Sequence, residues 1–243
     1  MVLNFYAQLV IGPSGSGKST YCKVIQSMSE ILNRNVHIIN LDPAADYLPY
    51  DPLIDVRDLI TLKDVMEEYK LGPNGGLVFC IEYLLQNFDW FETELDKIAE
   101  EDYIMIDCPG QLELYSHMPT IQMFSARLID MGFSICCVCL IDSTFIHDEY
   151  KFIGGMLMAL SFIVSLNLPN ICVISKCDLV SDKKILQKVV DSIAEDGYYT
   201  DDDVVEPMVD HSTSKTAFKA KYDSLVQAFK QVVSLVDRRL WIS

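Results

Sequence analysis

The stretch Leu9–Thr20, L-V-I-G-P-S-G-S-G-K-S-T, decides how the rest of the chain is organised. Gly12, Gly17, Lys18 and Ser19 occupy every fixed position of the pattern G-x-x-x-x-G-K-[ST], whose backbone N–H groups cradle phosphates. An apolar run precedes the pattern and a helical periodicity follows it, which is the strand–loop–helix setting that this motif requires. A chance glycine-rich turn is the weaker interpretation. The stretch therefore predicts a phosphate-binding loop at a helix N-terminus.

Lys18 is expected to reach the outer phosphates of a nucleotide, and Ser19 to hold a Mg²⁺ ion. The predicted nucleotide-binding residues of this loop are Gly12, Pro13, Ser14, Gly15, Ser16, Gly17, Lys18, Ser19 and Thr20.

Composition and charge exclude several classes of protein. The chain has 243 residues, half of them apolar, and a formal net charge of −16. A core large enough for one α/β domain over residues 1–243 is therefore expected. The excess of acidic residues argues against direct nucleic-acid binding, which needs a basic face. The sequence shows no run of basic residues that would anchor it to a membrane surface and no apolar stretch long enough to span a membrane.

Eight cysteines are present, and most are scattered singly. Cys136 and Cys139 form a C-x-x-C, but it lies in an apolar run that reads as a strand, where residues three apart face opposite ways. Reduced cysteines serving as small hydrophobic residues in an intracellular protein are the favoured interpretation. A cytoplasmic protein is predicted.

Strand and helix patterns alternate along the chain, which predicts a mostly parallel sheet covered by helices on both faces. The predicted strands span residues 5–11, 36–41, 103–106, 133–141 and 171–175. The predicted helices span residues 19–32, 55–69, 77–100 with a break near Asn87, 118–131, 149–166 and 215–236, and residues 72–76 form a sharp turn.

Polar residues follow several of these strands, where ligands of open α/β sheets bind. Asp107 ends a strand and is expected to hold Mg²⁺, and the N–H of Gly110 is expected to sense a terminal phosphate. Gln111 lies where Ras-like proteins place the glutamine that orients the attacking water. Asp42 ends another strand and is expected to lie near the metal or the water, unless it only caps the local turn.

The segment Ser175-Lys176-Cys177-Asp178 follows the pattern [NT]-K-x-D, with serine at its first position. A carboxylate in this pattern accepts two N–H donors of guanine that adenine does not offer, while the lysine stem covers the base. The pattern favours GTP over ATP and assigns Ser175, Lys176 and Asp178 to the base. A solvated turn is the alternative.

The sequence resembles the GPN-loop GTPases. The resemblance rests on G-P-N at residues 72–74, N-L-D-P-A-A at 40–45, D-C-P-G-Q-L-E at 107–113 and S-K-C-D at 175–178. The longer stretches G-P-N-G-G-L-V-F-C and D-C-P-G-Q-L-E-L-Y-S-H-M-P are most similar to the third eukaryotic paralogue group of that family. The likeness covers about residues 6–179.

The resemblance implies a P-loop fold with a GPN-loop insertion at about residues 55–100. It implies a homodimer, or a heterodimer with a related GPN-loop GTPase, in which the loop Gly72-Pro73-Asn74 of each subunit enters the other's nucleotide site. Asn74 would then contact the released phosphate in trans, and Gln111 and Glu113, with Asp42, would position the water. It also implies assembly and nuclear import of RNA polymerase II subunits, with shuttling between cytoplasm and nucleus.

The chain departs from the family at two places. Asp46 stands where many members carry glutamate, and the chain stops at Ser243 where the family continues with a further βα unit. A C-terminal βα unit is therefore expected to be missing. His211–Ser214 superficially resembles the family's guanine-contacting loop but lacks a preceding apolar strand.

The leading hypothesis is a slow Mg²⁺-dependent GTPase that acts as a nucleotide-gated assembly factor. One alternative is a catalytically weak or inactive dimerising binding module. A P-loop kinase is a third, but such enzymes present several arginines to the transferred phosphate, and only Arg57 is placed for that role here. The apolar residues near the GPN turn fit either a dimer interface or an ordinary helix core: Met66, Leu71, Leu77, Val78, Ile81, Tyr83 and Leu84.

Overall fold

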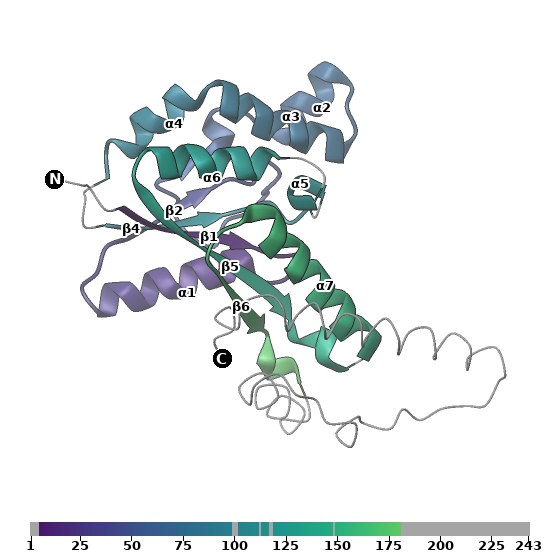
Figure 1. The fold of residues 1–243 in the computed structure, drawn as a ribbon. Coiled ribbons are helices and arrows are strands. Elements are labelled where there is room, and N and C mark those ends of the chain that lie inside the picture. Colours follow the sequence, from purple (N-terminus) through teal and green to yellow (C-terminus); the bar gives the residue numbers. More distant parts are fainter. Residues whose placement is uncertain (1–4, 99–101, 112, 117–118, 148, 181–243) are drawn as a thin grey trace.

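One parallel sheet, with helices packed on both of its faces, forms the framework of the protein (Figure 1). The structure, a computed structural model, describes residues 5–98, 102–111, 113–116, 119–147 and 149–180. The strands run in the order β3-β2-β4-β1-β5-β6, and each neighbouring pair is parallel. They are β1 (Phe5–Ile11), β2 (Val36–Asn40), β3 (Ile54–Asp55), β4 (Tyr103–Asp107), β5 (Phe133–Asp142) and β6 (Asn170–Ser175).

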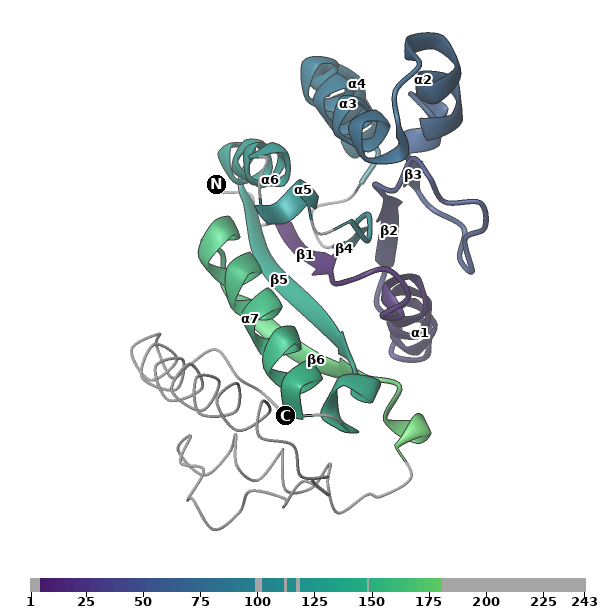
Figure 2. The same ribbon diagram turned by 90° about the vertical axis from the view of Figure 1, so that its right-hand side faces the viewer.

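The helices lie in two layers, as Figure 2 shows. Helix α1 (Lys18–Ile31) covers one face of the sheet. The other side carries α3 (Pro73–Gln86), α4 (Phe88–Leu95), α5 (Glu113–Ser116), α6 (Thr120–Asp130) and α7 (Glu149–Leu166), and α2 (Leu62–Tyr69) packs against α3. The predicted α/β fold with helices on both faces is confirmed.

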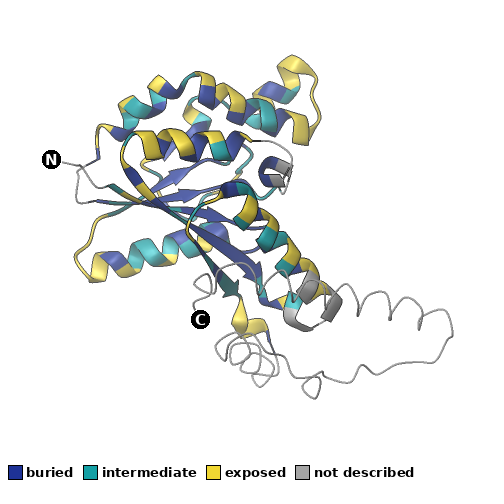
Figure 3. Ribbon diagram, in the orientation of Figure 1, coloured by how far each residue is buried: buried dark blue, intermediate teal, exposed yellow. Residues whose placement is uncertain are grey.

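Alternate residues of the strands belong to two separate hydrophobic cores, because successive side chains of a strand point to opposite faces of the sheet. Leu9 of β1 belongs to the larger cluster, which includes Phe88 and Phe124 on the many-helix side. Val10 belongs to a smaller cluster with Cys22 of α1. In Figure 3 the strands are mostly buried, least so in the edge strand β6, whereas the helices expose their outer sides. Burial of each large apolar side chain stabilises the fold by about 1.5–3 kcal/mol.

The connection after β1 determines where a ligand binds. The chain leaves β1, forms α1, and returns to β2, which lies two places away beyond β4, while β5 lies on the other side of β1. Open parallel sheets bind ligands at the carboxyl ends of their strands, at such a reversal of strand order. The phosphate-binding loop lies at this point.

Two predictions between residues 54 and 76 are wrong in detail. Residues 55–69 do not form one helix: Ile54–Asp55 pair with β2 as β3, and α2 begins only at Leu62, where the Thr61 side chain accepts a hydrogen bond from the N–H of Asp64. A strand of two residues is too short to show a period, so the helical spacing of its neighbours concealed it.

The second correction concerns the predicted turn at residues 72–76. Gly72 is the N-cap of α3 and Pro73 is its first residue, so the G-P-N segment is the first turn of a helix. Proline is favoured at this position because the N–H that it lacks would have no partner within the helix. The predicted break at Asn87 is confirmed, since α3 ends at Gln86 and α4 begins at Phe88.

The predicted helix at residues 215–236, the segment His211–Ser214 and the expected loss of a C-terminal βα unit lie outside the described residues. None of the helices within the described ranges combines the length and apolar character that a bilayer span requires.

Candidate functional site

Three glycines shape the phosphate-binding loop between β1 and α1. Gly12, Gly15 and Gly17 have φ angles of 147°, 77° and 91°, which glycine adopts without steric cost. A Cβ atom on Gly12 would also lie 2.5 Å from the carbonyl oxygen of Leu140 on β5. The loop is therefore closely packed against the sheet, and its backbone turns tightly into α1.

Lys18, the first residue of α1, bends back over this loop. Its Nζ donates hydrogen bonds to the carbonyl oxygens of Gly12 and Pro13, both at 3.1 Å. Its side chain is buried, and this burial lowers its pKa, although the nearby Asp107 carboxylate partly offsets the effect. The ammonium group is thus held at the mouth of the loop in surroundings that strengthen its attraction for an anion.

Asp107 ends β4 directly beside β1, opposite Val10 in the register. Its side chain is 3% exposed, and burial raises the pKa of its carboxyl group despite a 2.6 Å hydrogen bond to Oδ2 from the Tyr50 hydroxyl. Burial and the neighbouring carboxylate also raise the pKa of Tyr50, so the phenol stays protonated and donates. Asp107 Oδ1 has no hydrogen-bond partner among the described residues.

This oxygen fits a divalent cation. A buried carboxylate oxygen without a partner is costly unless a ligand satisfies it. The Ser19 hydroxyl lies near enough to the Asp107 carboxylate to lower its pKa as a weak hydrogen-bond donor, but too far away for a regular hydrogen bond, and both side chains line the same pocket. A hydroxyl and a carboxylate are the donors that Mg²⁺ takes in nucleotide sites.

Gly110 closes on the phosphate-binding loop from the β4 side. A Cβ atom at Gly110 would lie 2.8 Å from Ser14 Cα and 3.1 Å from Lys18 Nζ. Only glycine lets the chain after β4 approach the loop so closely, and the approach brings Gln111 to the same pocket.

Asp42 lies near the start of the loop between β2 and β3, where it both caps a turn and faces the pocket. Its Oδ1 accepts a 2.9 Å hydrogen bond from the N–H of Ala44, and its own N–H donates to Asn40 Oδ1 at 3.0 Å. It therefore caps a local turn, but it also lines the pocket. Burial raises the pKa of Asp42, against the lowering effects of the Ala44 bond and of Lys18.

Arg57 is engaged by Asp55 and is not presented to the pocket. Its Nε donates to both carboxylate oxygens of Asp55 at 3.0 Å, and its NH1 donates to the carbonyl oxygen of Ala45 at 2.9 Å. Asn40 donates to the same carboxylate at 2.9 Å. The local ion pair is confirmed, and the one arginine that favoured a kinase serves to fix the β2–β3 loop.

Lys18, Ser19, Asp42, Asp107 and Gly110 surround one pocket of about 300 Å³, a volume typical of small-molecule sites. It is lined by three segments: the phosphate-binding loop, the loop after β2 and the loop after β4. The lining residues are Ser14, Gly15, Lys18, Ser19, Asn40, Asp42, Ala44, Ala45, Tyr47, Leu48, Asp107, Cys108, Gly110 and Gln111.

Several predicted site residues are not among the residues that line the pocket. Gly12, Pro13, Ser16 and Gly17 belong to the loop but are not among the lining residues, and Thr20 is exposed on α1 outside the lining. Glu113 begins α5, and its side chain lies outside the described part of the chain.

The predicted base-binding segment is attached to the phosphate-binding loop. Ser175 Oγ donates a 2.7 Å hydrogen bond to the carbonyl oxygen of Ser16, so serine fills the first position of S-K-C-D as a connection between the two loops. Lys176 Nζ lies 2.7 Å from Asp142 Oδ2. Burial would raise the pKa of Asp142, but the bonds from Lys176 and Thr144 outweigh it and lower that pKa.

Asp178 follows in a short 3₁₀ turn, Cys177–Leu179, and is exposed. Its carboxylate is thus available at the surface, while Lys176 is held by Asp142. Because these residues do not line the 300 Å³ pocket, the predicted guanine end lies next to the pocket and not within it.

Gly72, Pro73 and Asn74 are exposed at the start of α3, and none of them lines the pocket. The chain therefore does not bring its own G-P-N segment to its phosphate site.

Sequence reasoning missed some of the pocket and one residue behind it. Tyr47 and Leu48 line the pocket although no motif marks them, and Ala45 lines it as the last residue of N-L-D-P-A-A, to which no role was assigned. Tyr50 contacts Asp107 from 57 positions away, and no local spacing indicates such a contact. Prolines at positions 43, 49 and 52 are typical of a loop, but no local pattern indicates the side of the sheet to which that loop returns.

Comparison with known proteins shows which family the chain resembles. Residues 10–240 match a family model described as "Conserved hypothetical ATP binding protein". The chain is 43% identical over 234 residues to a Danio rerio protein named GPN-loop GTPase 3, which covers 96% of this chain and 77% of that protein. A Dictyostelium discoideum protein of the same name is 49% identical over 189 residues, or 76% of this chain and 66% of that protein.

A solved structure has the same fold. It is an apo-form GTPase from Pyrococcus abyssi, with a TM-score of 0.64 and 27% sequence identity over 76% of this chain and 72% of that one.

Proposed function

Since the chain belongs to the GPN-loop GTPase family, we propose that it binds GTP together with Mg²⁺ in the pocket beside Lys18 and hydrolyses it to GDP and phosphate. The observation that carries this proposal is the meeting of three groups at one pocket. They are the phosphate-binding loop with Lys18, the buried Asp107 whose Oδ1 has no hydrogen-bond partner among the described residues, and Gly110, whose backbone lies close to Ser14.

The phosphate chain is held by the loop and by Lys18. Backbone N–H groups at the N-terminus of α1 and the Lys18 ammonium present positive charge to phosphate oxygens. Because Lys18 is buried and already oriented by two carbonyl oxygens, little reorganisation is needed when negative charge develops on the transferred phosphoryl group.

Ser19 and Asp107 would hold Mg²⁺, which neutralises charge on the β- and γ-phosphates when bound. The chain's own contribution is to keep the Asp107 carboxylate buried and oriented towards the pocket. Asp42, Gln111 and Glu113 are proposed to position the attacking water. Burial raises the pKa of Asp42, which makes its carboxylate a better proton acceptor than an exposed aspartate.

Replacing Gln111 with alanine tests this assignment. If Gln111 orients water and does not hold nucleotide, hydrolysis should fall about 100-fold while GDP affinity changes less than about threefold. Single-turnover phosphate release and titration with a fluorescent GDP analogue measure the two quantities. Gln86→Ala, at an exposed position in the last turn of α3, is the matched control. Equal losses of binding and turnover would contradict a role in water positioning.

Guanine selectivity is proposed to come from Asp178, whose carboxylate would accept the two N–H donors of the base. The hydrogen bond between Ser175 and the carbonyl oxygen of Ser16 supports this proposal, because it connects the base-binding segment to the phosphate-binding loop.

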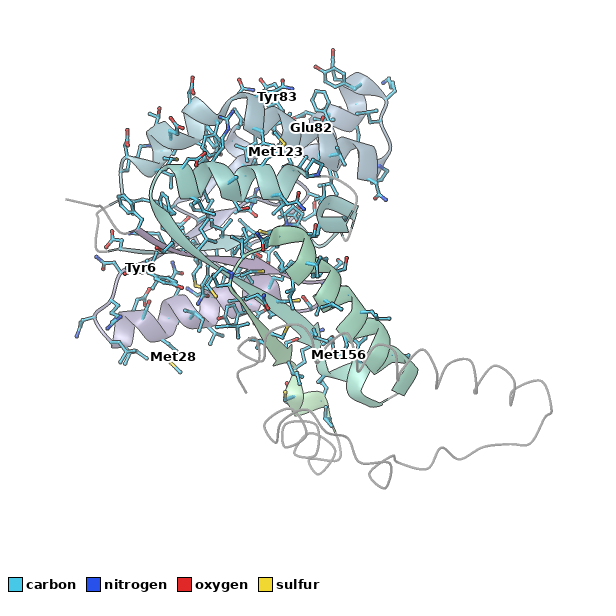
Figure 4. The ribbon with its side chains drawn as sticks, in the orientation of Figure 1. Tyr6, Met28, Glu82, Tyr83, Met123 and Met156 are labelled. Atoms are coloured by element: carbon cyan, nitrogen blue, oxygen red, sulfur yellow. The ribbon has the colours of Figure 1, made fainter. Side chains whose placement is uncertain are left out.

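We propose that the chain is a single GTPase domain whose insertion comprises α2 to α4, and that it dimerises through this insertion. Leu77, Ile81 and Leu84 are buried in the large core, which is the ordinary helix-core interpretation. Leu71 and Tyr83 are each 36% exposed, and Tyr83 lies on the outer side of α3 in Figure 4. Exposed apolar groups beside the G-P-N segment suit an interface with a second copy or a related GPN-loop GTPase.

A role in assembling RNA polymerase II subunits and in their nuclear import, with this chain in the cytoplasm and shuttling, is proposed from the resemblance alone. Depletion of the protein should then leave polymerase subunits in the cytoplasm, as judged by fluorescence imaging. Unchanged nuclear polymerase would contradict the proposal.

A further inference from the structure

Tyr50 is the residue behind the pocket that the proposed reaction does not yet use. It lies in the β2–β3 loop, two residues after the pocket-lining Leu48, and its side chain is only 6% exposed. The ring packs in the smaller core cluster, which includes Cys22 of α1 and Ile38 of β2. The ring is therefore fixed in place by the core, independently of any nucleotide.

The hydroxyl of Tyr50 has one particular acceptor. It donates to Asp107 Oδ2 at 2.6 Å, while Asp107 Oδ1 has no partner among the described residues. An aspartate carboxylate otherwise rotates broadly about its last torsion. A short hydrogen bond from a fixed donor selects one orientation, in which one oxygen is occupied and the other remains to bind a ligand.

We propose that Tyr50 is a positioning residue, which holds Asp107 so that its Oδ1 is presented to a divalent cation. The inference rests on the proposed function, because it takes Asp107 as a ligand of that cation. Groups that orient a metal ligand in this way commonly change metal affinity by about 10- to 100-fold when they are removed.

The same contact connects the β2–β3 loop to the metal ligand. This loop is fixed near its start by the hydrogen bonds of Asp42 and by Arg57, which donates to the Ala45 carbonyl oxygen. Near its end, Leu53 N–H donates to the Ile38 carbonyl oxygen at 2.8 Å. Tyr50 adds a tie to β4, so cation binding at Asp107 and the placement of the loop favour each other reciprocally.

A purely structural Tyr50 would contribute through its ring alone. Tyr50→Phe keeps the ring and removes only the hydroxyl, so it separates the two roles. The measurement is binding of a fluorescent GDP analogue at a series of Mg²⁺ concentrations and in EDTA, with thermal unfolding as the check on folding.

We expect Tyr50→Phe to raise the Mg²⁺ concentration for half-maximal enhancement of GDP binding by about tenfold, with affinity in EDTA unchanged within about twofold. Tyr21→Phe is the matched control, because the Tyr21 hydroxyl donates to Gln8 Oε1 at 3.3 Å, away from the pocket. That variant should reproduce the wild-type Mg²⁺ curve.

A double variant shows whether Tyr50 acts through Asp107. Asp107→Asn should weaken the Mg²⁺ response strongly, and adding Tyr50→Phe to it should cause no further shift. An additional tenfold shift in the double variant would overturn the inference, as would a Tyr50→Phe curve that coincides with wild type or an equal loss of affinity in EDTA. If wild-type protein binds GDP with no response to Mg²⁺, the proposed metal site itself is wrong, which is a distinguishable result.

Discussion

Replacement of Lys18 with alanine is expected to lower GTP hydrolysis by about 100- to 1000-fold, the cost of removing one preorganised electrostatic group from a phosphoryl-transfer site. The Nζ of Lys18 is buried and held by the carbonyl oxygens of Gly12 and Pro13. A cation from solvent therefore does not readily take its place in the Lys18→Ala variant. GTP affinity should fall as well, because the same ammonium binds the phosphates before reaction. Phosphate release under single-turnover conditions is the measurement.

Arg34→Ala serves as the control, since Arg34 is an exposed cation after α1, outside both the pocket and the insertion α2 to α4. The hydrolysis rate of this control variant should match that of the wild type. If Lys18→Ala retained more than about a tenth of wild-type activity while folding normally, Lys18 would not be the main phosphate-binding cation.

The second prediction with a large expected effect is that a mixture of two inactive variants recovers GTP hydrolysis. Asn74 is exposed and does not line its own pocket, so the proposed dimer requires it from the partner subunit. Lys18→Ala damages the pocket but keeps the G-P-N segment, whereas Asn74→Ala does the reverse. A mixed dimer then contains one complete site, formed by the pocket of one subunit and Asn74 of the other.

Each variant alone should be nearly inactive, and an equal mixture should recover about a quarter of the wild-type rate per protomer. Half of the dimers would be mixed, and each would hold one complete site of two. Steady-state phosphate release after refolding or co-expression measures the recovery. No recovery, together with a monomer in sedimentation with a GTP analogue, would contradict action in trans. If hydrolysis recovered only when a related GPN-loop GTPase was added, that protein and not a second copy of this chain would be the partner.

The sequence predicts best where the chemistry is local. The path from β1 through the glycine-rich loop into α1 is specified within about a dozen positions. The glycines that allow its tight turns, Gly12 and Gly17, and the start of α1 at Lys18 all lie close together in the sequence. Asp107 and Gly110 line the pocket, as their position after a buried strand predicts, because the end of such a strand marks the ligand edge of a parallel sheet.

Prediction was weaker where the result depends on contacts between distant segments. β3 consists of Ile54 and Asp55 and exists because they pair with Ile39 and Asn40 of β2, which no periodicity reveals. Tyr50 meets Asp107 only after the β2–β3 loop has folded against the sheet. Thr20 is exposed on α1 and its side chain is not among those that line the pocket, because one step along a helix turns a side chain by about 100°.

The account depends most on one property, a guanine nucleotide site formed by the phosphate-binding loop and the segment that ends at Asp178. Competition of unlabelled GTP, GDP and ATP against a fluorescent GDP analogue, on this chain with Mg²⁺ present, tests that property directly. We expect GTP and GDP to displace the analogue at least about 100-fold more effectively than ATP, because a site that hydrogen-bonds the guanine edge leaves its acceptor unpaired against adenine. Equal displacement by ATP and GTP would contradict the account.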